Sequence, residues 1–362
     1  MSLDLQGIGL RVGAEVLVHD VSLRLERGAL HVLLGPTLAG KTTLMRLMAG
    51  LDRPTTGRLL LDGRDITGTA VRKRSVAMVY QQFVNYPTLS VYENIASPLR
   101  VAGVARAEIE RRVQHAAGLL RLEPMLGRMP AQLSGGQQQR TAIARALVKQ
   151  AELVLLDEPL GNLDYKLREE LREELPRLFA ESGAILVYAT TEPTEALLLG
   201  GTTVALTEGR VVQSGPAASV YRHPDGIEAA RVFSDPPLNE LAFEKRGMSL
   251  LLGAGQRIPA PAPLHGLADG PYRMGFRADD VTLGALPPGA LSVAGTVEVT
   301  EINGSESFVH VSTAYGTWVC LMPGVHEVPL GTTVDLHVDT TRAFVFGAGG
   351  HRVMPGLLAE AV

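Results

Sequence analysis

A nine-residue stretch near the start of the chain, GPTLAGKTT (35–43), constrains the fold more than any other feature of the sequence. It matches the pattern G-x-x-x-x-G-K-[ST], follows the apolar run LHVLLG (30–35) and precedes a helical pattern. In this arrangement backbone N–H groups at a helix N-terminus hold phosphate oxygens. We therefore expect a nucleotide-binding α/β fold in which Lys41 reaches the β- and γ-phosphates and Thr42 offers its hydroxyl to Mg²⁺.

Three further apolar runs indicate the rest of a buried sheet. They are VAMVYQ (76–81), LVLLDE (153–158) and AILVYAT (184–190). Because these runs are continuously apolar and do not alternate with polar residues, they are typical of strands buried on both faces of a parallel sheet.

The second of these runs ends in two acidic residues, Asp157 and Glu158. A carboxylate at the end of a buried strand can hold Mg²⁺ through water, so we expect Asp157 to do this. Glu158 can orient and deprotonate an attacking water. An apolar run that ends in Asp-Glu is a weak signal alone, and its pairing with the phosphate loop makes it specific.

Composition and charge exclude some classes of protein. The net charge of −4 and the isoelectric point near 6.2 argue against non-specific nucleic-acid binding. The single cysteine, Cys320, cannot form an internal disulfide, which fits a reducing compartment. The N-terminus lacks the basic start and apolar run of a signal peptide, and no stretch approaches the roughly 18 apolar residues of a membrane span. We therefore expect membrane association only through a partner.

The composition of the sequence changes near residue 240. IPAPAPLHGLADGP (258–271) is rich in proline and glycine, and we interpret it as a connector. Segments with alternating apolar and polar residues, typical of strands, follow it. Lys245 is the only lysine in residues 236–362. We expect domain 1–235, with a helical subdomain at about 85–150, and a small all-β domain, partly closed like an OB fold, at 236–362.

The octet LSGGQQQR (133–140) lies between the two phosphate-site motifs, at the start of a predicted helix. Its glycines expose backbone amides that suit an anion. On this octet, and on VYQQFVNYPTLSVYENI (79–95) and GNLD (161–164), the chain resembles the nucleotide-binding subunits of ABC transporters over nearly its whole length. The resemblance implies a P-loop NTPase cassette with a RecA-like core, an antiparallel β subdomain and a helical subdomain, followed by the OB-like domain.

The C-terminal part narrows the resemblance to one subfamily. EGRVVQSGPAASVYRHP (208–224), VFSDPPLN (232–239), GFRADDV (275–281) and GSESFVHV (304–311) look like the ATPases of carbohydrate and polyol importers, such as those for maltose and glycerol 3-phosphate. Two phrases, GPTLAGKT and VYATTEPTEALLLGG, also look like one of the two dissimilar ATPase subunits of bacterial glycerol importers.

The resemblance implies a head-to-tail dimer with two ATP molecules, each held between the phosphate loop of one subunit and the LSGGQ segment of the other. It assigns catalytic roles to Glu158, Gln81 and Thr191, and Mg²⁺ contacts to Thr42, Gln81 and Asp157. The ATP-binding residues that it implies are Val12, Gly35, Pro36, Thr37, Leu38, Ala39, Gly40, Lys41, Thr42, Thr43, Ser134, Gly135, Gly136, Gln137 and Asp164.

Three positions depart from the family pattern. Val12 stands where an aromatic residue normally stacks on adenine, and residues 1–79 contain no Phe, Trp or Tyr. Leu38 replaces a glycine that is frequent in the middle of the loop, so its side chain must point away from the phosphates or the loop must shift. Thr191 replaces the histidine that senses the γ-phosphate, or it merely caps the turn after the strand.

These observations predict an ATPase that powers an ABC importer for glycerol, glycerol phosphate or a related sugar or polyol. The alternative is a catalytically impaired partner in a heterodimeric ABC ATPase, because all three departures lie in the chain's own ATP pocket. The expected cofactors are ATP and Mg²⁺. The expected partners are a second ATP-binding subunit (a different chain or a second copy), two transmembrane permeases and a solute-binding protein, without nucleic acid, at the cytoplasmic face of the inner membrane.

Overall fold

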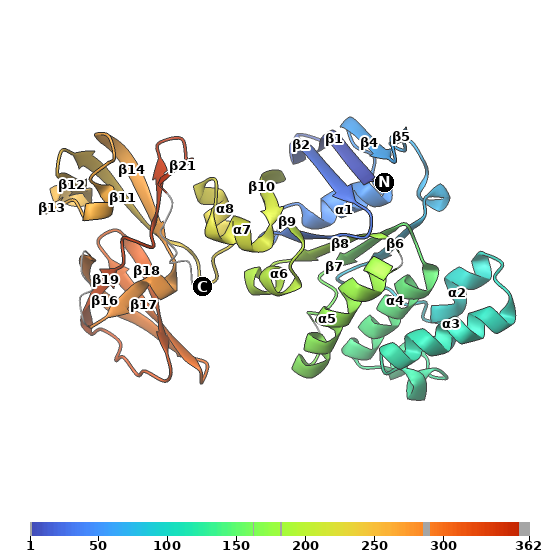
Figure 1. The fold of residues 1–362 in the computed structure, drawn as a ribbon. Coiled ribbons are helices and arrows are strands. Elements are labelled where there is room, and N and C mark those ends of the chain that lie inside the picture. The colour runs from blue at the N-terminus through green and yellow to red at the C-terminus, as the bar shows by residue number, and fades with distance from the viewer. Residues whose placement is uncertain (1, 162, 182, 285–289, 355–362) are drawn as a thin grey trace. The chain divides into compact units, whose positions relative to one another are not determined.

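The computed structural model describes residues 2–161, 163–181, 183–284 and 290–354 (Figure 1). The chain divides into two compact units, 1–217 and 218–362. Among the described residues, no helix has both the length and the apolar character needed to cross a membrane.

The first unit contains two sheets. The antiparallel sheet has the order β2-β1-β4-β5, with β1 (Ser2–Val12), β2 (Glu15–Glu26), β4 (Thr56–Leu61) and β5 (Arg64–Asp65). The larger sheet has the order β10-β9-β3-β8-β7-β6, with β3 (Leu30–Leu34), β6 (Val76–Val79), β7 (Leu153–Asp157), β8 (Ile185–Thr190), β9 (Thr202–Thr207) and β10 (Arg210–Pro216). All its neighbouring strands run parallel except β9 and β10. The four apolar runs singled out in the sequence are therefore β3, β6, β7 and β8 of one sheet, as predicted.

Helices cover both faces of this sheet. One hydrophobic core lies between the sheet, the antiparallel strands and α1 (Lys41–Ala49). The other lies between the opposite face and α2 (Val91–Val101), α3 (Arg106–Leu119), α4 (Gly135–Lys149) and α5 (Tyr165–Glu181). The last helix of the unit is α6 (Pro193–Leu199). Strands buried on both faces need continuous apolar sequence, which explains the pattern of the four runs.

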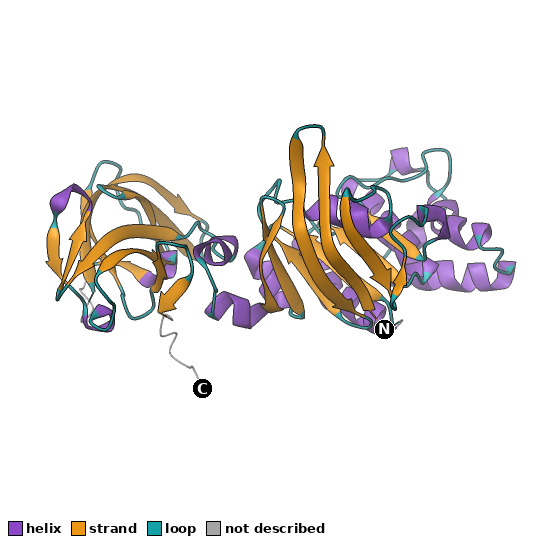
Figure 2. Cartoon of the chain, turned by 90° about the horizontal axis from the view of Figure 1, so that it is seen from above, coloured by secondary structure: helices purple, strands orange, loops and turns teal. Residues whose placement is uncertain are grey.

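The second unit consists mainly of antiparallel strands (Figure 2). One sheet has the order β13-β12-β11-β14-β20-β21, with β11 (Asn239–Arg246), β12 (Ser249–Leu252), β13 (Arg257–Pro259), β14 (Gly270–Phe276), β20 (Phe344–Gly347) and β21 (Arg352–Met354). The other has the order β15-β19-β16-β17-β18, with β15 (Val281–Leu283), β16 (Leu291–Ile302), β17 (Glu306–Thr313), β18 (Gly316–Pro323) and β19 (Thr333–Val338). Side chains from both sheets share one core around Trp318 and Met274.

The segment 258–271 runs from β13 to the start of β14 inside the second unit, so it is a connector within the β domain. Strands β11 and β12 precede it and pair with each other, and β11 pairs with β14, which begins at Gly270. The proline-rich stretch is therefore a crossing inside the β domain. The sequence pattern predicted strands after this stretch, and it missed β11 and β12, which lie before it.

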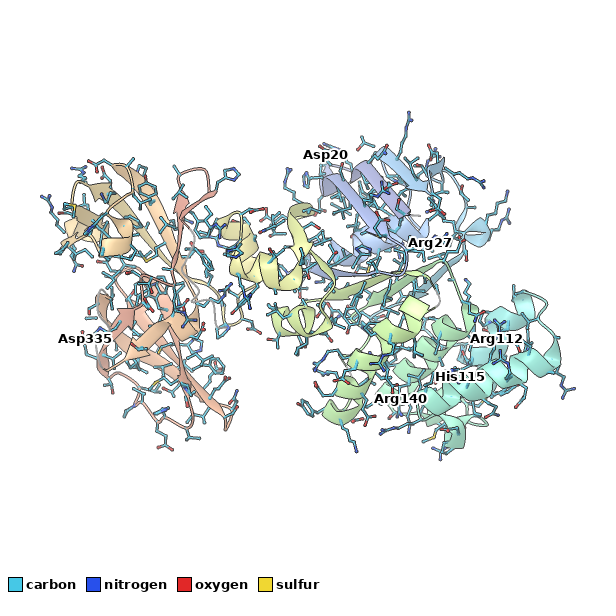
Figure 3. The ribbon with its side chains drawn as sticks, in the orientation of Figure 1. Asp20, Arg27, Arg112, His115, Arg140 and Asp335 are labelled. Carbon is cyan, nitrogen blue, oxygen red and sulfur yellow. The ribbon has the colours of Figure 1, made fainter. Side chains whose placement is uncertain are left out.

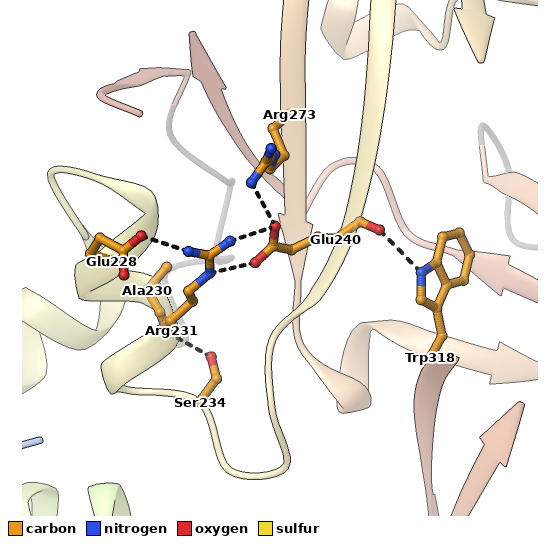
Figure 4. Close-up of polar contacts among 7 residues, drawn as sticks. All are labelled: Glu228, Ala230, Arg231, Ser234, Glu240, Arg273 and Trp318. Carbon is orange, nitrogen blue, oxygen red and sulfur yellow. Dashed lines mark hydrogen bonds and ion pairs between the residues drawn. The ribbon is translucent and has the colours of Figure 1, made fainter. Parts of the chain in front are cut away.

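Two short helices, α7 (Ala217–Arg222) and α8 (Ile227–Val232), precede the β strands. Arg231 on α8 donates to both carboxylate oxygens of Glu240 on β11, at 2.6 and 2.9 Å, and Arg273 donates to the same carboxylate at 3.2 Å (Figure 4). The Arg277 guanidinium lies 3.7 Å from the ring centroid of Tyr221 on α7. These contacts explain why the second unit begins before α8, and the boundary expected between 235 and 236 stays a prediction.

Candidate functional site

The phosphate loop connects the central strand β3 to α1. Gly35 follows the strand, and the first turn of the helix contains Lys41, Thr42 and Thr43. Gly40, at the helix N-cap, has φ of 95°, a backbone conformation that glycine adopts without strain. A Cβ on Gly40 would lie 3.2 Å from Cα of Gly209, so a side chain here would require the neighbouring backbone to shift by a few tenths of an ångström.

Leu38 has a backbone conformation that is unfavourable for leucine. Its φ is 68°, in the left-handed region, and its side chain is 95% exposed. Pro36 and Thr37 are also exposed, whereas Ala39 is buried and donates its N–H to the Pro36 carbonyl at 3.1 Å. The leucine side chain therefore lies in solvent, and its direction relative to bound phosphates stays a prediction.

Lys41 is buried among loop carbonyls and acidic groups. Its Nζ donates to the carbonyls of Gly35 (2.8 Å) and Pro36 (3.1 Å) and lies 3.8 Å from Oε1 of Glu158. Burial lowers the pKa of Lys41, and the nearby carboxylates of Glu158 and Asp157 oppose that shift. The ammonium group is thus held beside the loop that would receive the phosphates.

Thr42 and Asp157 come from segments 115 residues apart and meet at the edge of the sheet. The Thr42 hydroxyl donates to Oδ2 of Asp157 at 2.7 Å. Asp157 is 2% exposed, and burial raises the pKa of its carboxyl group, while the Thr42 hydrogen bond and the Lys41 charge lower it. A buried carboxylate beside a hydroxyl offers the oxygen ligands that Mg²⁺ prefers, and phosphates and water commonly supply the rest. Within the described part of the chain no cluster of three His, Cys, Asp or Glu residues could hold a metal by itself.

Glu158 follows Asp157 and has φ of 46°, an uncommon value for a residue other than glycine. Its N–H donates to the Ala189 carbonyl at 3.0 Å, and its Oε2 accepts from Nε2 of Gln81 at 2.8 Å. The structure thus brings Glu158 and Gln81 together from positions 77 residues apart. Gln81 contacts this carboxylate, and among the described hydrogen bonds none joins it to Thr42 or Asp157.

Thr191 lies directly after β8, whose last residues contact the phosphate loop at Gly35 and the acidic motif at Glu158. The preceding residue, Thr190, accepts the Gly35 N–H through its carbonyl at 3.4 Å, and its hydroxyl accepts the Glu192 N–H at 3.0 Å. Thr190 therefore caps the turn, and the suggestion that Thr191 does so is wrong. The Thr191 side chain is exposed.

Val12 ends β1 at the tip of the β1–β2 hairpin and is 60% exposed. The hairpin approaches the phosphate loop through Gly209, whose N–H donates to Ala39 at 3.0 Å and whose carbonyl accepts from His19 at 2.9 Å. Val12 is thus an exposed apolar side chain on a hairpin that is connected to the loop through Gly209.

The signature residues lie at the exposed N-terminus of α4. Ser134 caps this helix: its hydroxyl accepts the Gln137 N–H at 3.3 Å, and its own N–H donates to Oε1 of Gln137 at 3.0 Å. Gly135 is exposed and Gly136 is partly exposed, so the free amides at the positive end of the helix dipole suit an anion. Among the described contacts, no hydrogen bond or ion pair joins Ser134 or Gln137 to the chain's own phosphate loop.

Other residues hold the signature helix in place. Arg140 (Figure 3) donates to the carbonyl of Leu120 at 3.1 Å and so ties α4 to the end of α3. Asp164 caps α5 by accepting the Leu167 N–H at 3.0 Å. The Arg140 contact therefore fixes α4 relative to α3, whereas the Asp164 contact is local to the start of α5.

Sequence reasoning missed the residues that organise the loop after Gln81. Asn94 is fully buried, accepts the Tyr86 N–H at 2.8 Å and donates to three carbonyls of the loop and helix start. Arg145 on α4 donates to the Val84 carbonyl and lies 5.1 Å from the Tyr86 ring centroid. The segment 79–95 contains Asn94, but sequence reasoning assigned a role only to Gln81 in that segment.

A groove of about 480 Å³ lies beside this loop. The residues that line it come from β6, the loop, α2 and α4: Val76, Ala77, Met78, Tyr86, Leu89, Ser97, Pro98, Val101, Ala142, Arg145, Ala146 and Lys149. Val101 is 91% exposed and Tyr86 49% exposed, so the groove presents apolar surface to a partner.

Comparisons with known proteins agree with this geometry. Residues 18–161 match the family described as ABC transporter, and residues 274–346 match the TOBE domain. The chain is 35% identical to sn-glycerol-3-phosphate import ATP-binding protein UgpC 1 of Rhizobium johnstonii, over 97% of this chain and 96% of that protein. It is 46% identical to the spermidine/putrescine import ATP-binding protein PotA of Pseudomonas aeruginosa, over 61% of each chain.

A solved structure of a cassette, MJ0796, covers the same region. It is described as a dimeric post-hydrolysis state bound to ADP and Pi, and it is 29% identical with a TM-score of 0.55. The match covers 59% of this chain and 98% of that one. The predicted fold class, a nucleotide-binding cassette followed by an OB-like β domain, is thereby confirmed.

Proposed function

Because the chain belongs to the family of ABC transporter ATP-binding proteins, we propose that the solute whose import it powers is glycerol phosphate, glycerol or a related sugar or polyol. Its role in general terms is that of a transport ATPase, which binds ATP and uses hydrolysis to drive import through membrane subunits. The observation that carries the solute class is the match to a glycerol-phosphate importer ATPase along 97% of this chain. The polyamine relative matches over 61% of this chain, a length that need not include the C-terminal unit.

The arrangement of the site supports a single hydrolytic centre in each cassette. Glu158 is the general base that we propose for the attacking water, and Gln81 orients its carboxylate through the 2.8 Å hydrogen bond. Lys41 and the amides of the loop hold the phosphates and stabilise charge that develops on them. We assign Mg²⁺ to Thr42 and Asp157, and we propose that Gln81 also contacts the ion. The ion would neutralise charge on the β- and γ-phosphates.

The signature segment serves a second nucleotide in this proposal. Its amides are exposed on α4 and have no contact with the chain's own loop among the described residues, so they suit an ATP held by a partner cassette. We propose that this partner is a different ATP-binding subunit. The departures at Val12, Leu38 and Thr191 support this, because all three lie in the chain's own pocket while Ser134, Gly135, Gly136 and Gln137 keep the family pattern.

The groove beside the loop after Gln81 supports a docking site for the membrane subunits. Arg145 connects this loop to α4, and Gln81 connects its start to Glu158. Movement of a permease segment in the groove would therefore reach both the general base and the signature helix. We place the protein at the cytoplasmic face of the inner membrane, bound to two permeases that receive solute from a binding protein.

Uptake measurements test the proposed solute. Cells that lack the gene for this chain and carry either the wild type or Glu158→Gln are assayed with labelled glycerol 3-phosphate, glycerol, maltose, spermidine and Fe³⁺. We expect Glu158→Gln to abolish uptake of one polyol or sugar and to leave spermidine and Fe³⁺ uptake unchanged. Loss of spermidine or Fe³⁺ uptake alone would contradict the proposed solute class.

A further inference from the structure

Three buried polar side chains lie at the end of β8, and the motifs described above do not use them. Tyr188 and Thr190 are each 2% exposed, and Glu195 on α6 is 8% exposed. The Tyr188 hydroxyl donates to Oε1 of Glu195 at 2.7 Å. Burying polar groups is costly unless they are hydrogen-bonded, so such a cluster has few alternative arrangements.

The Glu195 carboxyl group faces a defined set of polar groups. Burial raises its pKa, hydrogen bonds from Thr190 and Tyr188 lower it, and the charges of Glu192 and Arg168 act in opposite directions. Thr190 thus interacts with Glu195 from the strand that ends at the site. The cluster connects the strand end to the start of α6.

Hydrogen bonds hold the backbone on both sides of Thr191, and the Thr190 hydroxyl of the cluster accepts one of them. Before it, the Thr190 carbonyl accepts from the Gly35 N–H at 3.4 Å, and the neighbouring Ala189 carbonyl accepts from Glu158 at 3.0 Å. After it, the Glu192 N–H donates to the Thr190 hydroxyl at 3.0 Å. Thr191 is therefore fixed between the phosphate loop and the general base by contacts that its own side chain does not make.

Arg168 on α5 extends this connection to the loop before α5. It donates to the Gly161 carbonyl at 3.2 Å and lies 3.8 Å from the Glu192 carboxylate. Threonine is a short side chain with one rotatable hydroxyl, so it cannot compensate for a misplaced backbone by reaching further. A site that uses threonine here depends strongly on how the backbone is held.

We propose that Tyr188 and Glu195 are positioning residues for ATP hydrolysis, whose buried hydrogen bond sets the place of Thr191 relative to Glu158. This rests on the proposed function. Tyr188 and Glu195 touch no reacting atom; they act through Thr190 and the turn at Glu192. The role predicts that their loss lowers the rate of hydrolysis and leaves nucleotide binding intact.

A double-mutant cycle tests this role in the assembled transporter. Tyr188→Phe removes one hydroxyl and keeps the ring that fills the core. We expect kcat to fall about tenfold, as for loss of a hydrogen bond to a charged group, with KM for ATP unchanged within about twofold. In a Thr191→Ala background the same substitution should cause no further loss of kcat, because the residue that it positions is gone.

Glu195 provides a second measurement. Glu195→Gln keeps an acceptor for Tyr188 and should retain most of the activity, whereas Glu195→Ala should match Tyr188→Phe. Tyr92→Phe is the control, because Tyr92 also donates to a glutamate, Glu110, at 2.6 Å, but on the exposed helical segment. It should leave kcat unchanged.

Either of two results would overturn the positioning role of Tyr188 and Glu195 and leave the proposed function standing. In an active complex, an equal loss of kcat with and without Thr191 would show that Tyr188 acts independently of it. A rise in KM with unchanged kcat would show a role in binding. A wild-type complex without any ATPase activity would instead overturn the proposed function, and this assignment with it.

Discussion

The phosphate loop and the signature helix are two ATP-facing segments of one cassette, and they differ in how closely they follow the family pattern. In the pocket, Lys41, Asp157 and Glu158 match the family pattern. Each forms a hydrogen bond there: Lys41 to the phosphate loop, Asp157 to Thr42 and Glu158 to Gln81. Val12, Leu38 and Thr191 depart from the pattern around them. The signature segment shows no departure, and its capping box is complete.

This difference indicates that the phosphate loop and the signature helix have separate roles in ATP hydrolysis. In our proposal the phosphate anchors and the general base are retained, whereas the contacts that would hold adenine and sense the γ-phosphate are weaker. A chain with these features would contribute a full signature to its partner's ATP and a slower site of its own. The following substitutions test each half of that contrast.

The largest effect is expected at the general base. Glu158→Gln should preserve ATP binding and lower single-turnover hydrolysis at this site by about 10²–10⁴. The measurement resolves the two sites with labelled ATP in the assembled complex. Glu173→Gln, an exposed glutamate on α5, is the control. An unchanged rate at this site would remove Glu158 from the catalytic role.

The signature segment is tested by Gly136→Asp, which places a carboxylate beside the partner's γ-phosphate. Two like charges about 4 Å apart near a protein surface repel by roughly 4 kcal/mol, so hydrolysis at the partner's site should fall about a thousandfold. ATP binding to the isolated chain should not change. Gly127→Asp adds the same charge at a glycine with open space around it. If Gly136→Asp weakened ATP binding to the isolated chain, the signature would face its own nucleotide.

The adenine contact is tested by Val12→Trp. If stacking is the missing interaction, worth roughly 1–3 kcal/mol, the Kd for ATP should fall by about ten- to a hundredfold. Titration with ATP measures this, and Val325→Trp is the matched control because both valines are 60% exposed. Equal affinities for wild type and Val12→Trp would mean that another group already covers the base.

The smallest effect is expected from Leu38→Gly. A leucine with positive φ is strained, and a fully exposed side chain loses no packing when it is removed. After the extra entropy of glycine in the unfolded chain, the substitution should raise the free energy of unfolding by about 1 kcal/mol. Denaturant unfolding measures it, against Leu330→Gly at another exposed leucine that lacks a positive φ. Equal changes for both would show that Leu38 is not strained.

Local sequence was sufficient where short-range preferences decide the structure. The glycines of the phosphate loop, the serine and glutamine of the capping box and the apolar runs of β3, β6, β7 and β8 each act through neighbours a few residues away. The same reasoning missed β11 and β12, which precede the segment 258–271, because composition describes a stretch and not the strands that pair around it.

The sequence motifs identify the groups that we propose to hold and hydrolyse ATP, and the class of sheet that carries them. Which of these groups contact one another follows from the folded arrangement of the strands and helices. Thr42 reaches Asp157 across 115 residues, Gln81 reaches Glu158 across 77, and Thr190 rather than Thr191 caps the turn after β8. The physical reason is that dihedral preferences and caps are local, whereas strand order, register and the burial of Tyr188 and Glu195 depend on how the whole core packs.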